Sequence, residues 1–496
     1  MNPVRVATIV EALGRAGLLR GTEGVLPQAV DAITDDSRAM SANALFLAVR
    51  GSERDGHEYL GRAESGGAVL AVVDDASRSS LPSLVVTDTR KAAAVAAATF
   101  YGEPAQQLKL VAVTGTNGKT TTVGMLRHLL DAPDARCASI GTLGVLIGSG
   151  GAPLKGGSGL TTPGPVELQR LLRTLHDLGV RTVAMETSSH ALHQGRVEGL
   201  RFAAGVFTNL TRDHLDYHLT MDAYLAAKAL LIPLIADDGT AVVNADDPAW
   251  ASLPPAPQTV RFGLNGGADV RAADVRFGPR GSEWDLVIDI RQLPNAIAEH
   301  HAVRLPLIGD FNIANAIGAA AAAWSVGVPV DEIARRLSTM PQVPGRLEII
   351  NEDPSVLRDY AHTPDALARA LDAVRPFTTG KLIVVFGCGG DRDKGKRPEM
   401  GRIAETHADV AFVTSDNPRT EDPERILDDV EAGMQKPHER IEDRREAIAH
   451  AIHSAKGGDV VVLAGKGHED YQIRGTVKYP FDEQLIVGEI ISEGTT

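Results

Sequence analysis

One stretch of this sequence, residues 108–121, limits the folds that the chain can adopt. It reads L-K-L-V-A-V-T-G-T-N-G-K-T-T, and the helix-favouring run M-L-R-H-L-L follows at residues 125–130. An apolar, β-branched run predicts a buried strand, two nearby glycines predict a tight turn, and the next run predicts a helix. A strand, a glycine turn and a helix in this order are typical of a phosphate-binding loop in an α/β fold.

The glycines and the lysine of this turn have the chemistry that binds phosphate. Gly115 and Gly118 lack a Cβ and let backbone N–H groups turn toward an anion, while the following helix adds the positive end of its dipole. Lys119 is placed to reach the β- and γ-phosphates, and a hydroxyl of one of the next two threonines to bind Mg²⁺. The usual motif has glycine where this chain has Val113, so the loop starts later, as T-G-T-N-G-K-T-T.

Length and composition narrow the class of protein. The 496 residues exceed what one hydrophobic core supports, and predict roughly three domains. A net charge of −14 argues against nucleic-acid or anionic-membrane partners, because both need clustered Lys and Arg. Only Cys137 and Cys388 occur, no apolar run approaches the ~20 residues that span a bilayer, and no signal-type segment begins the chain. We therefore expect a cytoplasmic protein without membrane insertion.

The pattern of strands and helices predicts an α/β chain of three domains. Residues 1–103 form a small α/β domain with strands near 44–49, 69–73 and 84–86. Residues 104–338 form the central domain, which contains the phosphate loop and a sheet rich in parallel strands. The Pro/Gly-rich segment at 340–346 marks the hinge into residues 339–496, where strands near 382–386, 410–414 and 460–464 predict a Rossmann-like domain.

Three side chains of the central domain are candidates for the chemistry. Glu186 ends a buried-looking strand, where it can complete a Mg²⁺ shell. His214 and His218 lie four residues apart, but a second zinc-type pair is missing, so His214 is better interpreted as a residue at or near Mg²⁺. Lys228 lies among apolar helix residues and either reaches solvent or, if desolvated, takes up CO₂ as a metal-binding carbamate.

Each predicted strand of the last domain runs into a polar cluster. These clusters are G-C-G-G-D-R-D at 387–393, S-D-N-P-R at 415–419 and G-K-G-H-E-D at 465–470. The first lacks the full dinucleotide motif and has no ribose-binding acid about 20 residues on, so a cleft for a small zwitterion fits better. Arg392 and Arg419 offer planar forks for carboxylates, whereas Asp416 and Glu469 can hold an ammonium group.

The motifs occur together in an order that resembles the Mur ligases of peptidoglycan synthesis. They are T-G-T-N-G-K-T-T, A-M-E-T-S-S-H, N-L-T-R-D-H-L-D-Y-H, D-Y-A-H-T-P, F-G-C-G-G-D-R-D-K-G-K-R-P, D-N-P-R and A-G-K-G-H-E-D. The resemblance covers essentially the whole chain. It implies an N-terminal domain for the UDP end of the substrate, a central ATPase and a C-terminal domain for the incoming amino acid. It also implies an ATP-dependent amide ligase that passes through an acyl phosphate.

The resemblance also assigns roles to matching positions. It implies Lys119, Glu186, His214 and a carbamylated Lys228 as catalytic, with Mg²⁺ at Thr120, Glu186, His214 and Lys228. ATP contacts would be Gly115, Thr116, Asn117, Gly118, Lys119, Thr120, Thr121, Asn312, Arg346 and Asp359. The UDP-substrate contacts would be Ser37, Ser52, Glu53, Arg54, Thr161, Thr162, Ser188, Gln194 and Arg196. Leu160 stands where some relatives have asparagine, which affects one such contact.

The amino-acid site would consist of Arg392, Asp416, Asn417, Pro418, Arg419, Gly465 and Glu469. The D-N-P-R version of this site resembles that of relatives that add meso-diaminopimelate to UDP-N-acetylmuramoyl-L-alanyl-D-glutamate. An arginine fork favours the second carboxylate of that substrate and disfavours lysine. The alternatives are a lysine-adding relative, a folylpolyglutamate-type ligase and, outside the enzymes, a P-loop switch protein. We expect a monomer.

Overall fold

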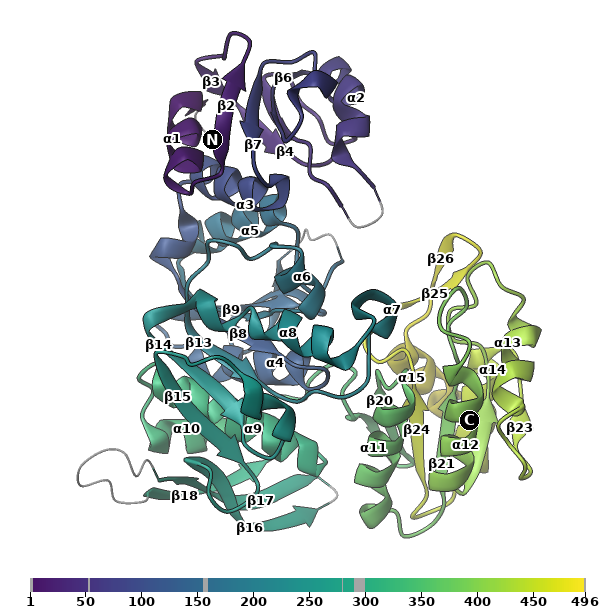
Figure 1. The fold of residues 1–496 in the computed structure, drawn as a ribbon. Helices are drawn as coiled ribbons and strands as arrows, with labels where there is room; N and C mark the ends of the chain where they lie inside the picture. Colours follow the sequence, from purple (N-terminus) through teal and green to yellow (C-terminus); the bar gives the residue numbers. More distant parts are fainter. Residues whose placement is uncertain (1–2, 52–53, 155–158, 279, 290–298, 495–496) are drawn as a thin grey trace. The chain divides into compact units, whose positions relative to one another are not determined.

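The structure is a computed structural model that describes residues 3–51, 54–154, 159–278, 280–289 and 299–494. Figure 1 shows its helices and strands, coloured along the sequence. The chain divides into two compact units. The first consists of Met1–Arg271, Ile288–Glu299 and Asn315–Ile333, and the second of Ala272–Val287, His300–Ala314 and Ala334–Thr496. Of the site residues expected from the sequence, Ser52 and Glu53 lie outside the described residues.

The N-terminal part of the first unit is a sheet between helices. The sheet has the order β2-β7-β6-β5-β4, with bounds β2 Leu19–Glu23, β4 Ala32–Thr34, β5 Ala44–Leu47, β6 Ala68–Val73 and β7 Ser83–Val86. Its helices are α1 Val6–Arg15, α2 Leu60–Ser65 and α3 Thr89–Phe100, and β1 Val4–Arg5 pairs with β3 Ala29–Val30. Leu45 and Leu47 pack into the core with α1 and α3, whereas Phe46 packs into the core with α2. This alternation of side chains explains the continuous apolar run.

The phosphate loop follows the central strand of the next sheet. The order is β11-β10-β9-β12-β8-β13-β14-β15-β16, and the strands from β9 to β16 are parallel, while β10 and β11 are antiparallel. The bounds are β8 Lys109–Thr114, β9 Arg136–Gly141, β10 Gly144–Ile147, β11 Ala152–Leu154, β12 Val180–Glu186, β13 Phe202–Phe207, β14 Ile235–Asn244, β15 Gln258–Gly263 and β16 Val270–Gly278. Because parallel strands end at one edge, the residues after β8, β12 and β13 meet there.

Helices flank this sheet and carry several of the expected site residues. Their bounds are α4 Lys119–Leu130, α5 Pro165–Asp177, α6 Ser189–His193, α7 Leu215–His218, α8 Met221–Ala229 and α9 Asp310–Ser325, and the 3₁₀ turns η4 Ile232–Leu234 and η5 Pro248–Ser252 follow α8 and β14. Residues Asn315 onward of α9 belong to the first unit. The alanine run 319–323 of α9 is fully buried, so this helix packs through small side chains.

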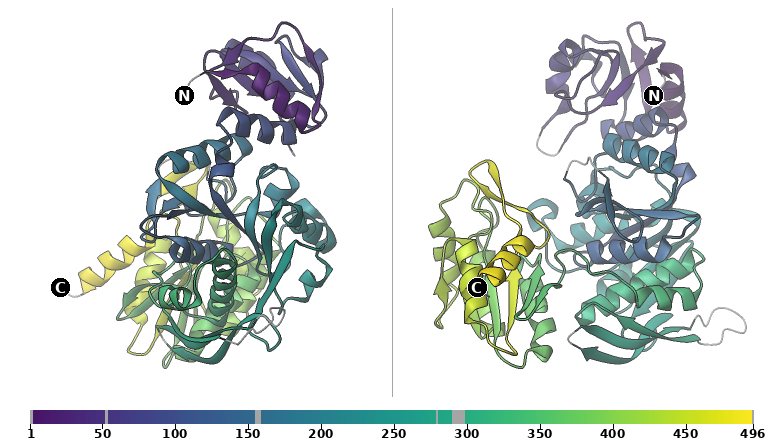
Figure 2. Two further views of the ribbon diagram at one scale, coloured as in Figure 1. Left: turned by 90° about the vertical axis from the view of Figure 1, so that its left-hand side faces the viewer. Right: turned by 180° about the vertical axis from the view of Figure 1, so that it is seen from behind.

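The second unit contains a sheet with helices on both faces (Figures 1 and 2). Its order is β19-β20-β24-β21-β22-β23, with bounds β19 Glu348–Glu352, β20 Ser355–Asp359, β21 Leu382–Phe386, β22 Val410–Val413, β23 Glu439–Arg440 and β24 Val460–Ala464. One face packs on α11 Pro364–Val374, α12 Lys396–His407 and α13 Pro423–Glu431, the other on α14 Arg444–Ser454 and α15 Glu483–Gly494. The remaining elements are β17 Gly281–Ile288, β18 Glu299–Leu305, α10 Val330–Leu337 and the hairpin β25 Tyr471–Arg474 with β26 Val477–Pro480.

A buried ion pair joins the last helix to this sheet. The side chains of Arg444 on α14 and Glu483 on α15 are both 0% exposed, and Arg444 Nη2 lies 2.7 Å from Glu483 Oε1. The same Nη2 donates to the backbone oxygen of Ala464 at the end of β24, at 3.0 Å. Breaking such a buried pair leaves an uncompensated charge, so α15 is fixed to the strand whose loop begins at Gly465.

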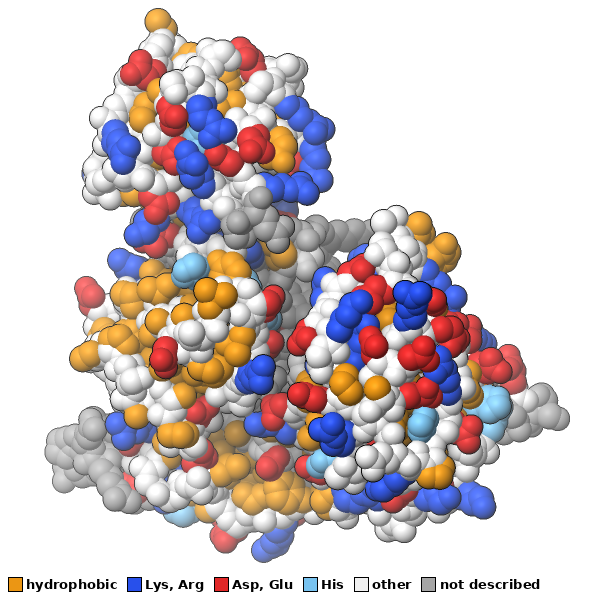
Figure 3. Space-filling model, turned by 45° about the vertical axis from the view of Figure 1, so that its right-hand side comes forward, with side chains coloured by type: hydrophobic (Ala, Val, Ile, Leu, Met, Phe, Trp, Pro, Cys, Tyr) orange, Lys and Arg blue, Asp and Glu red, His pale blue; other side chains and the backbone are white. Residues whose placement is uncertain are grey.

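The described surface offers two further observations. On the face drawn in Figure 3, basic and acidic side chains are interspersed over the described residues instead of forming a basic stripe. Among the described residues, every helix is too short or too polar to cross a lipid bilayer.

Candidate active site

The phosphate loop fits its surroundings only because two of its residues are glycines. Gly115 and Gly118 have φ angles of +145° and +84°. A Cβ on Gly115 would lie 1.8 Å from Thr208 Oγ1, and a Cβ on Gly118 would lie 2.2 Å from Asn315 Oδ1. Both clashes are shorter than any real contact, so larger residues would displace the loop.

A second loop, residues 208–211 after β13, holds the phosphate loop from one side. The N–H of Thr116 donates to the backbone oxygen of Asn209 at 2.7 Å, and the N–H of Asn117 donates to Asn209 Oδ1 at 2.9 Å. Thr208 Oγ1 donates to the backbone oxygen of Asn117 at 2.7 Å. Two N–H groups of the loop therefore already donate to Asn209. We expect a bound anion to be held mainly by the N–H groups in the first turn of α4.

Lys119 begins α4, and its side chain turns back over the loop. Its Nζ donates to the backbone oxygens of Gly115 and Thr116 at 2.9 and 2.8 Å. A phosphate that enters the loop can take over this ammonium, because a charge-assisted bond to phosphate is stronger than a bond to a neutral carbonyl.

Lys228 on α8 is buried beside Lys119. It is 1% exposed, its Nζ donates to the same Gly115 oxygen at 2.7 Å, and it lies 4.3 Å from the ring centroid of Tyr224. Burial, and then the charge of Lys119, holds the pKa of Lys228 well below its usual value. The structure therefore contradicts the solvent-reaching alternative and favours the desolvated one. A buried amine whose pKa is lowered in this way gives up its proton more easily, which suits carbamate formation.

Glu186 ends β12 and is 1% exposed. Its Oε1 accepts the N–H of Thr142 at 2.8 Å, and its Oε2 accepts the Thr142 hydroxyl at 3.2 Å. A Cβ on Gly141 would lie 2.3 Å from Glu186 Oε1, so glycine there makes room for the carboxylate. No sequence motif indicated Thr142 as the partner of Glu186.

Histidine and tyrosine rings cluster around His214. The ring of His190 lies 4.9 Å from that of His214 and 4.2 Å from that of Tyr217, measured between centroids. Burial, and then the neighbouring histidines, lowers the pKa of His190 to about 4, and burial also lowers the pKa of His214. His218 Nε2 lies 3.0 Å from Ser189 Oγ. These imidazoles are therefore neutral near pH 7 and can offer a lone pair.

The fit to Mg²⁺ depends on Lys228. Within the described part of the chain, three or more His, Cys, Asp or Glu side chains do not gather in a metal-binding arrangement. A carbamate on Lys228 would add an anion close to the phosphate loop, because Lys228 Nζ donates to the backbone oxygen of Gly115 in that loop. Thr120, Glu186 and His214 would then provide the oxygen and nitrogen donors that the sequence predicted.

The residues expected to bind the UDP substrate connect to Glu186. Thr162 Oγ1 donates to the backbone oxygen of Glu186 at 2.9 Å and accepts the N–H of Ser188 at 3.1 Å. Arg196 Nη1 donates to the backbone oxygen of Thr162 at 3.0 Å, and its Nε donates to Gln194 Oε1 at 3.0 Å. These side chains form one hydrogen-bonded group. Thr161 lies next to it, with its Oγ1 3.2 Å from Thr142 Oγ1.

Two other expected substrate residues lie in the N-terminal part of the unit. Ser37 follows β4, and Arg54 precedes the 3₁₀ turn η1 Gly56–Tyr59. Among the contacts given for the described residues, none joins Ser37 or Arg54 to the Thr162 group. Their role stays a prediction.

The second unit brings Arg346 and Asp359 together. Asp359 ends β20, and its Oδ2 accepts the N–H of Leu347 at 2.7 Å. Burial raises the pKa of Asp359, and the charge of Arg346 opposes that shift. The Arg346 guanidinium carbon lies 4.8 Å from the ring centroid of Tyr360. Asn312 on α9 is buried, and its Nδ2 donates to the backbone oxygen of Ile308 at 2.8 Å.

The polar clusters after β21, β22 and β24 contact one another in the second unit. Asn417 Nδ2 donates to Glu469 Oε2 at 2.9 Å, and Arg419 Nη1 donates to the backbone oxygen of Gly390 at 2.8 Å. A Cβ on Gly390 would lie 1.9 Å from the backbone oxygen of Pro418, so this close approach requires glycine. Arg392 is exposed and bonds only its neighbour's carbonyl among the contacts given for the described chain.

Arg419 and Gly465 complete this group. The N–H of Arg419 donates to the backbone oxygen of Ile473 on β25 at 3.0 Å, and its backbone has φ +52°. Gly465 has φ +118°, and a Cβ there would lie 3.6 Å from Asp416 Oδ2. The hairpin β25–β26 therefore supports the D-N-P-R segment from outside the sheet.

Comparison with known proteins decides the family. Three family models match: "Mur ligase family, catalytic domain" over residues 29–107, "Mur ligase middle domain" over 113–323 and "Mur ligase, glutamate ligase domain" over 345–467. A Synechococcus elongatus protein named UDP-N-acetylmuramoyl-L-alanyl-D-glutamate–2,6-diaminopimelate ligase is 44% identical over 483 residues, 94% of this chain and 95% of the relative. The chain belongs to the Mur ligase family.

Further relatives agree with this assignment. A protein of the same name from Gloeobacter violaceus is 43% identical over 97% of this Mur ligase and 98% of its own length. A solved structure, also of a UDP-N-acetylmuramoyl-L-alanyl-D-glutamate–2,6-diaminopimelate ligase, has a TM-score of 0.67 at 32% identity and covers 96% of this chain and 98% of its own. A Thermotoga maritima MurF ligase in complex with ADP shares the fold at 20% identity, with a TM-score of 0.63 and coverage of 94% and 97%. The α/β fold with three Mur ligase domains is confirmed, whereas the boundaries at residues 103 and 338 stay predictions.

Several residues of this Mur ligase were missed by the sequence reasoning. Asn315 lies against Gly118, Asn209 binds the phosphate loop, and Tyr224 lies beneath Lys228. Asn315 follows Asn312 by one helical turn, and this spacing indicates that the two side chains lie on the same face of α9. Nothing in the sequence indicates that Asn209 uses up two amides of the loop.

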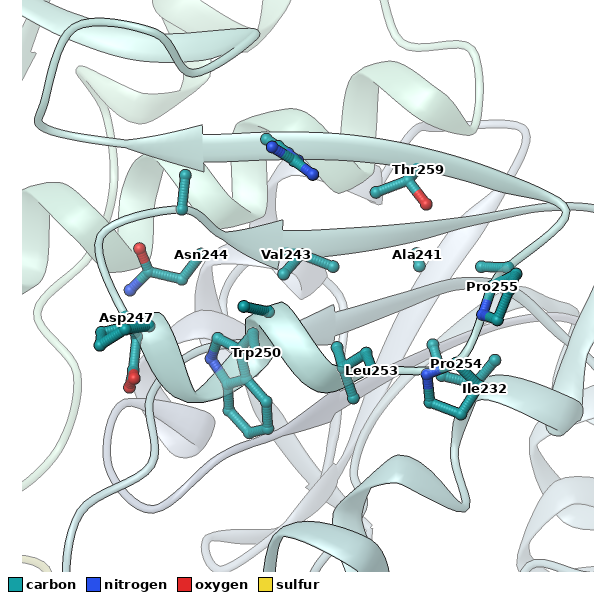
Figure 4. Close-up of a pocket in the computed structure, with 15 residues that line it drawn as sticks. Ile232, Ala241, Val243, Asn244, Asp247, Trp250, Leu253, Pro254, Pro255 and Thr259 are labelled. Atoms are coloured by element: carbon teal, nitrogen blue, oxygen red, sulfur yellow. The ribbon is translucent and has the colours of Figure 1, made fainter.

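A separate pocket lies on β14 and β15 beside η5 (Figure 4). Its volume is about 290 Å³, and Trp250, Leu253 and Pro254 contribute apolar walls. Two residues at its polar edge also support the loop that holds the phosphate-binding segment: Asn244 Nδ2 donates to the backbone oxygen of Thr208 at 2.7 Å, and Asp247 Oδ2 accepts the N–H of Leu210 at 2.6 Å. The expected site residues do not line this pocket.

Proposed function

We propose that this Mur ligase joins meso-2,6-diaminopimelate to UDP-N-acetylmuramoyl-L-alanyl-D-glutamate, with ATP and Mg²⁺, in peptidoglycan synthesis. Near-full-length similarity to relatives named for the diaminopimelate reaction supports the substrate pair. The phosphate loop and its two lysines support ATP use. The buried free thiols Cys137 and Cys388 suit a reducing cytoplasm, which we propose as the location of a monomeric enzyme.

One observation carries the choice of amino acid: an arginine and a carboxylate are held in the same group of loops in the second unit. Glu469 accepts from Asn417 through Oε2, and Arg419 uses Nη1 for Gly390. For Arg419 Nε and Nη2, the contacts of the described residues include no acceptor. Diaminopimelate brings a carboxylate and an amine at each end, so its distal carboxylate suits the guanidinium, whereas lysine would leave it unpaired.

The first half of the reaction activates a carboxylate. A carboxylate oxygen of the peptide attacks the γ-phosphorus of ATP, the bond to ADP breaks, and an acyl phosphate forms. Lys119 and the positive end of α4 stabilise the negative charge that moves onto the leaving ADP oxygen. Mg²⁺, when bound, would neutralise further phosphate charge at Thr120, Glu186, His214 and the carbamate of Lys228.

The second half forms the amide. The amine nitrogen of diaminopimelate attacks the acyl carbon, orthophosphate leaves with the electrons of the broken C–O bond, and the nitrogen loses a proton. Asp416, Asn417, Arg419 and Glu469 would orient the amino acid for this attack. Thr162, Ser188, Gln194 and Arg196 would hold the nucleotide-linked peptide.

A panel of amino acids tests the proposal. Purified protein with ATP, Mg²⁺ and the UDP-linked dipeptide is expected to release phosphate strongly with meso-diaminopimelate and weakly with lysine or glutamate. Strong turnover with lysine would support a lysine-adding relative, and turnover of a folate with glutamate would support a folylpolyglutamate-type ligase. Nucleotide-dependent partner binding without a covalent amide product would support a P-loop switch instead.

Arg419→Ala is expected to lower the preference for diaminopimelate over lysine by roughly 100-fold, because the distal carboxylate loses a charge-assisted partner. The ratio of kcat/KM values for the two amino acids measures this. Arg445→Ala is the control, since Arg445 is an exposed arginine of the same unit that pairs with Glu489. An unchanged preference in Arg419→Ala would refute the role of Arg419.

A further inference from the structure

The second unit contains a fully buried lysine, Lys466, to which the sequence gave no role. Its side chain is 0% exposed, and its Nζ donates to the backbone oxygen of Tyr471 at 2.7 Å and to Asn417 Oδ1 at 3.1 Å. The same Nζ lies 3.4 Å from Asp416 Oδ1 and 3.5 Å from Glu469 Oε2. A buried ammonium is costly unless it is paired, so these four contacts account for its presence.

Asn417 links the Lys466 ammonium to Glu469 through two hydrogen bonds. Its Oδ1 accepts from Lys466 Nζ and from the N–H of Ile473 at 2.9 Å. Because two donors face Oδ1, the amide can point only its NH₂ group toward Glu469 Oε2, to which it donates at 2.9 Å. Lys466 therefore fixes the Glu469 carboxylate both directly and through Asn417.

The charges at this place do not cancel. Asp416 and Glu469 are two carboxylates with side chains only 9% and 16% exposed, and they share the single ammonium of Lys466. Among the described residues, Lys466 is the cation that forms ion pairs with both carboxylates. One negative charge therefore remains in a largely buried site, where Coulomb attraction for an ammonium group is stronger than in water.

We propose that Lys466 is a positioning residue of the amino-acid site. Its ammonium fixes Asn417 and Glu469, and it reduces the site from two negative charges to one, so that the site binds one ammonium group of a diamino acid. The sequence assigned Asp416 and Glu469 to a substrate ammonium, whereas in the structure they first hold that of Lys466. This inference rests on the proposed function, because the ammonium group that the site binds is taken to be that of diaminopimelate.

The first test is Lys466→Met, which keeps the length of the side chain and removes its charge. The KM for diaminopimelate is expected to rise by about 30-fold or more, because the partners of a buried charge lose their geometry. The KM for ATP is expected to stay at the wild-type value. The yield of acyl phosphate formed without amino acid, trapped by borohydride reduction, is also expected to be unchanged.

Lys478→Met is the matched control. Lys478 lies on β26, and its Nζ is 3.7 Å from the ring centroid of Tyr471. This variant removes a lysine charge from the hairpin that Lys466 contacts through Tyr471, but leaves Asn417 and Glu469 in place. Its KM for diaminopimelate is expected to equal that of the wild type.

A second comparison keeps the inference testable if Lys466→Met does not fold. Glu469→Gln with Lys466→Met removes one charge of each sign, so the net charge of the group is the same as in the wild type. If Lys466 acts through Glu469, this double variant has the same KM for diaminopimelate as Glu469→Gln alone. If the double variant has a much higher KM than Glu469→Gln for both diaminopimelate and ATP, the role of Lys466 is purely structural and the inference is overturned.

The outcomes separate this inference from the proposed function. If the wild type releases no phosphate in response to diaminopimelate, the proposed function fails. If the wild type responds and Lys466→Met keeps the wild-type KM for diaminopimelate, only the role of Lys466 fails.

Discussion

Lys119→Ala is expected to reduce phosphate release by about 1,000-fold or more, because the ammonium that meets the transferring phosphoryl group is lost. The fold is expected to stay intact, since the side chain is half-buried and bonds carbonyls of its own loop. Steady-state kinetics and circular dichroism measure the two effects.

The control for this experiment is Lys109→Ala. Lys109 is the exposed first residue of β8, and its Nζ donates to the backbone oxygen of Val326 at 3.2 Å. Near-normal turnover is expected for this variant. Turnover above about a tenth of the wild-type rate in Lys119→Ala would rule out the charge stabilisation assigned to Lys119.

Lys228→Ala is expected to lower turnover by about 100-fold or more, because the proposed carbamate and the metal ligand that it would provide are lost together. Added formate or acetate is expected to restore part of the activity. Lys228 is 1% exposed, so its truncation leaves a buried space in which a short carboxylate can stand in for the carbamate. Phosphate release at increasing acetate concentration measures this recovery.

The same acetate series with Lys119→Ala is the control, and no recovery is expected there because that position needs a cation. A Lys228→Ala protein with normal turnover, or one whose lost activity no short carboxylate improves, would be incompatible with a carbamate at this position. Wild-type protein is expected to lose activity when CO₂ and bicarbonate are removed, because a carbamate on Lys228 would then dissociate into CO₂ and the free lysine amine, whose pKa burial lowers.

The fold was predictable from the sequence where local pattern and burial agree. The strand expected at 44–49 is β5 Ala44–Leu47, and the loop, lysine and helix after β8 lie where the glycines indicated. The three polar clusters of the last domain meet because parallel strands end at one edge. The spacing of apolar residues and the residue types of a turn are local properties, so they can be identified in a single sequence.

The site details were not predictable because they depend on distant parts of the chain. Whether Lys228 reaches solvent or is buried depends on packing against the phosphate loop, more than 100 residues away. The use of two loop amides by Asn209 and the fourfold contacts of Lys466 depend on tertiary structure in the same way. The two compact units each consist of several separate segments of the chain, and such an arrangement also depends on contacts between residues far apart in the sequence.

The ion pair between Arg444 and Glu483 affects the order in which the protein becomes functional during synthesis. Arg444 bonds the end of β24, but its carboxylate partner begins the last described helix. The nucleotide loop at residues 115–121 can take shape while the ribosome is still translating the second unit. The loop that starts at Gly465 lacks its anchor until Glu483 has left the exit tunnel, so a chain that stops short of α15 would lack this anchor for the loops of the amino-acid site.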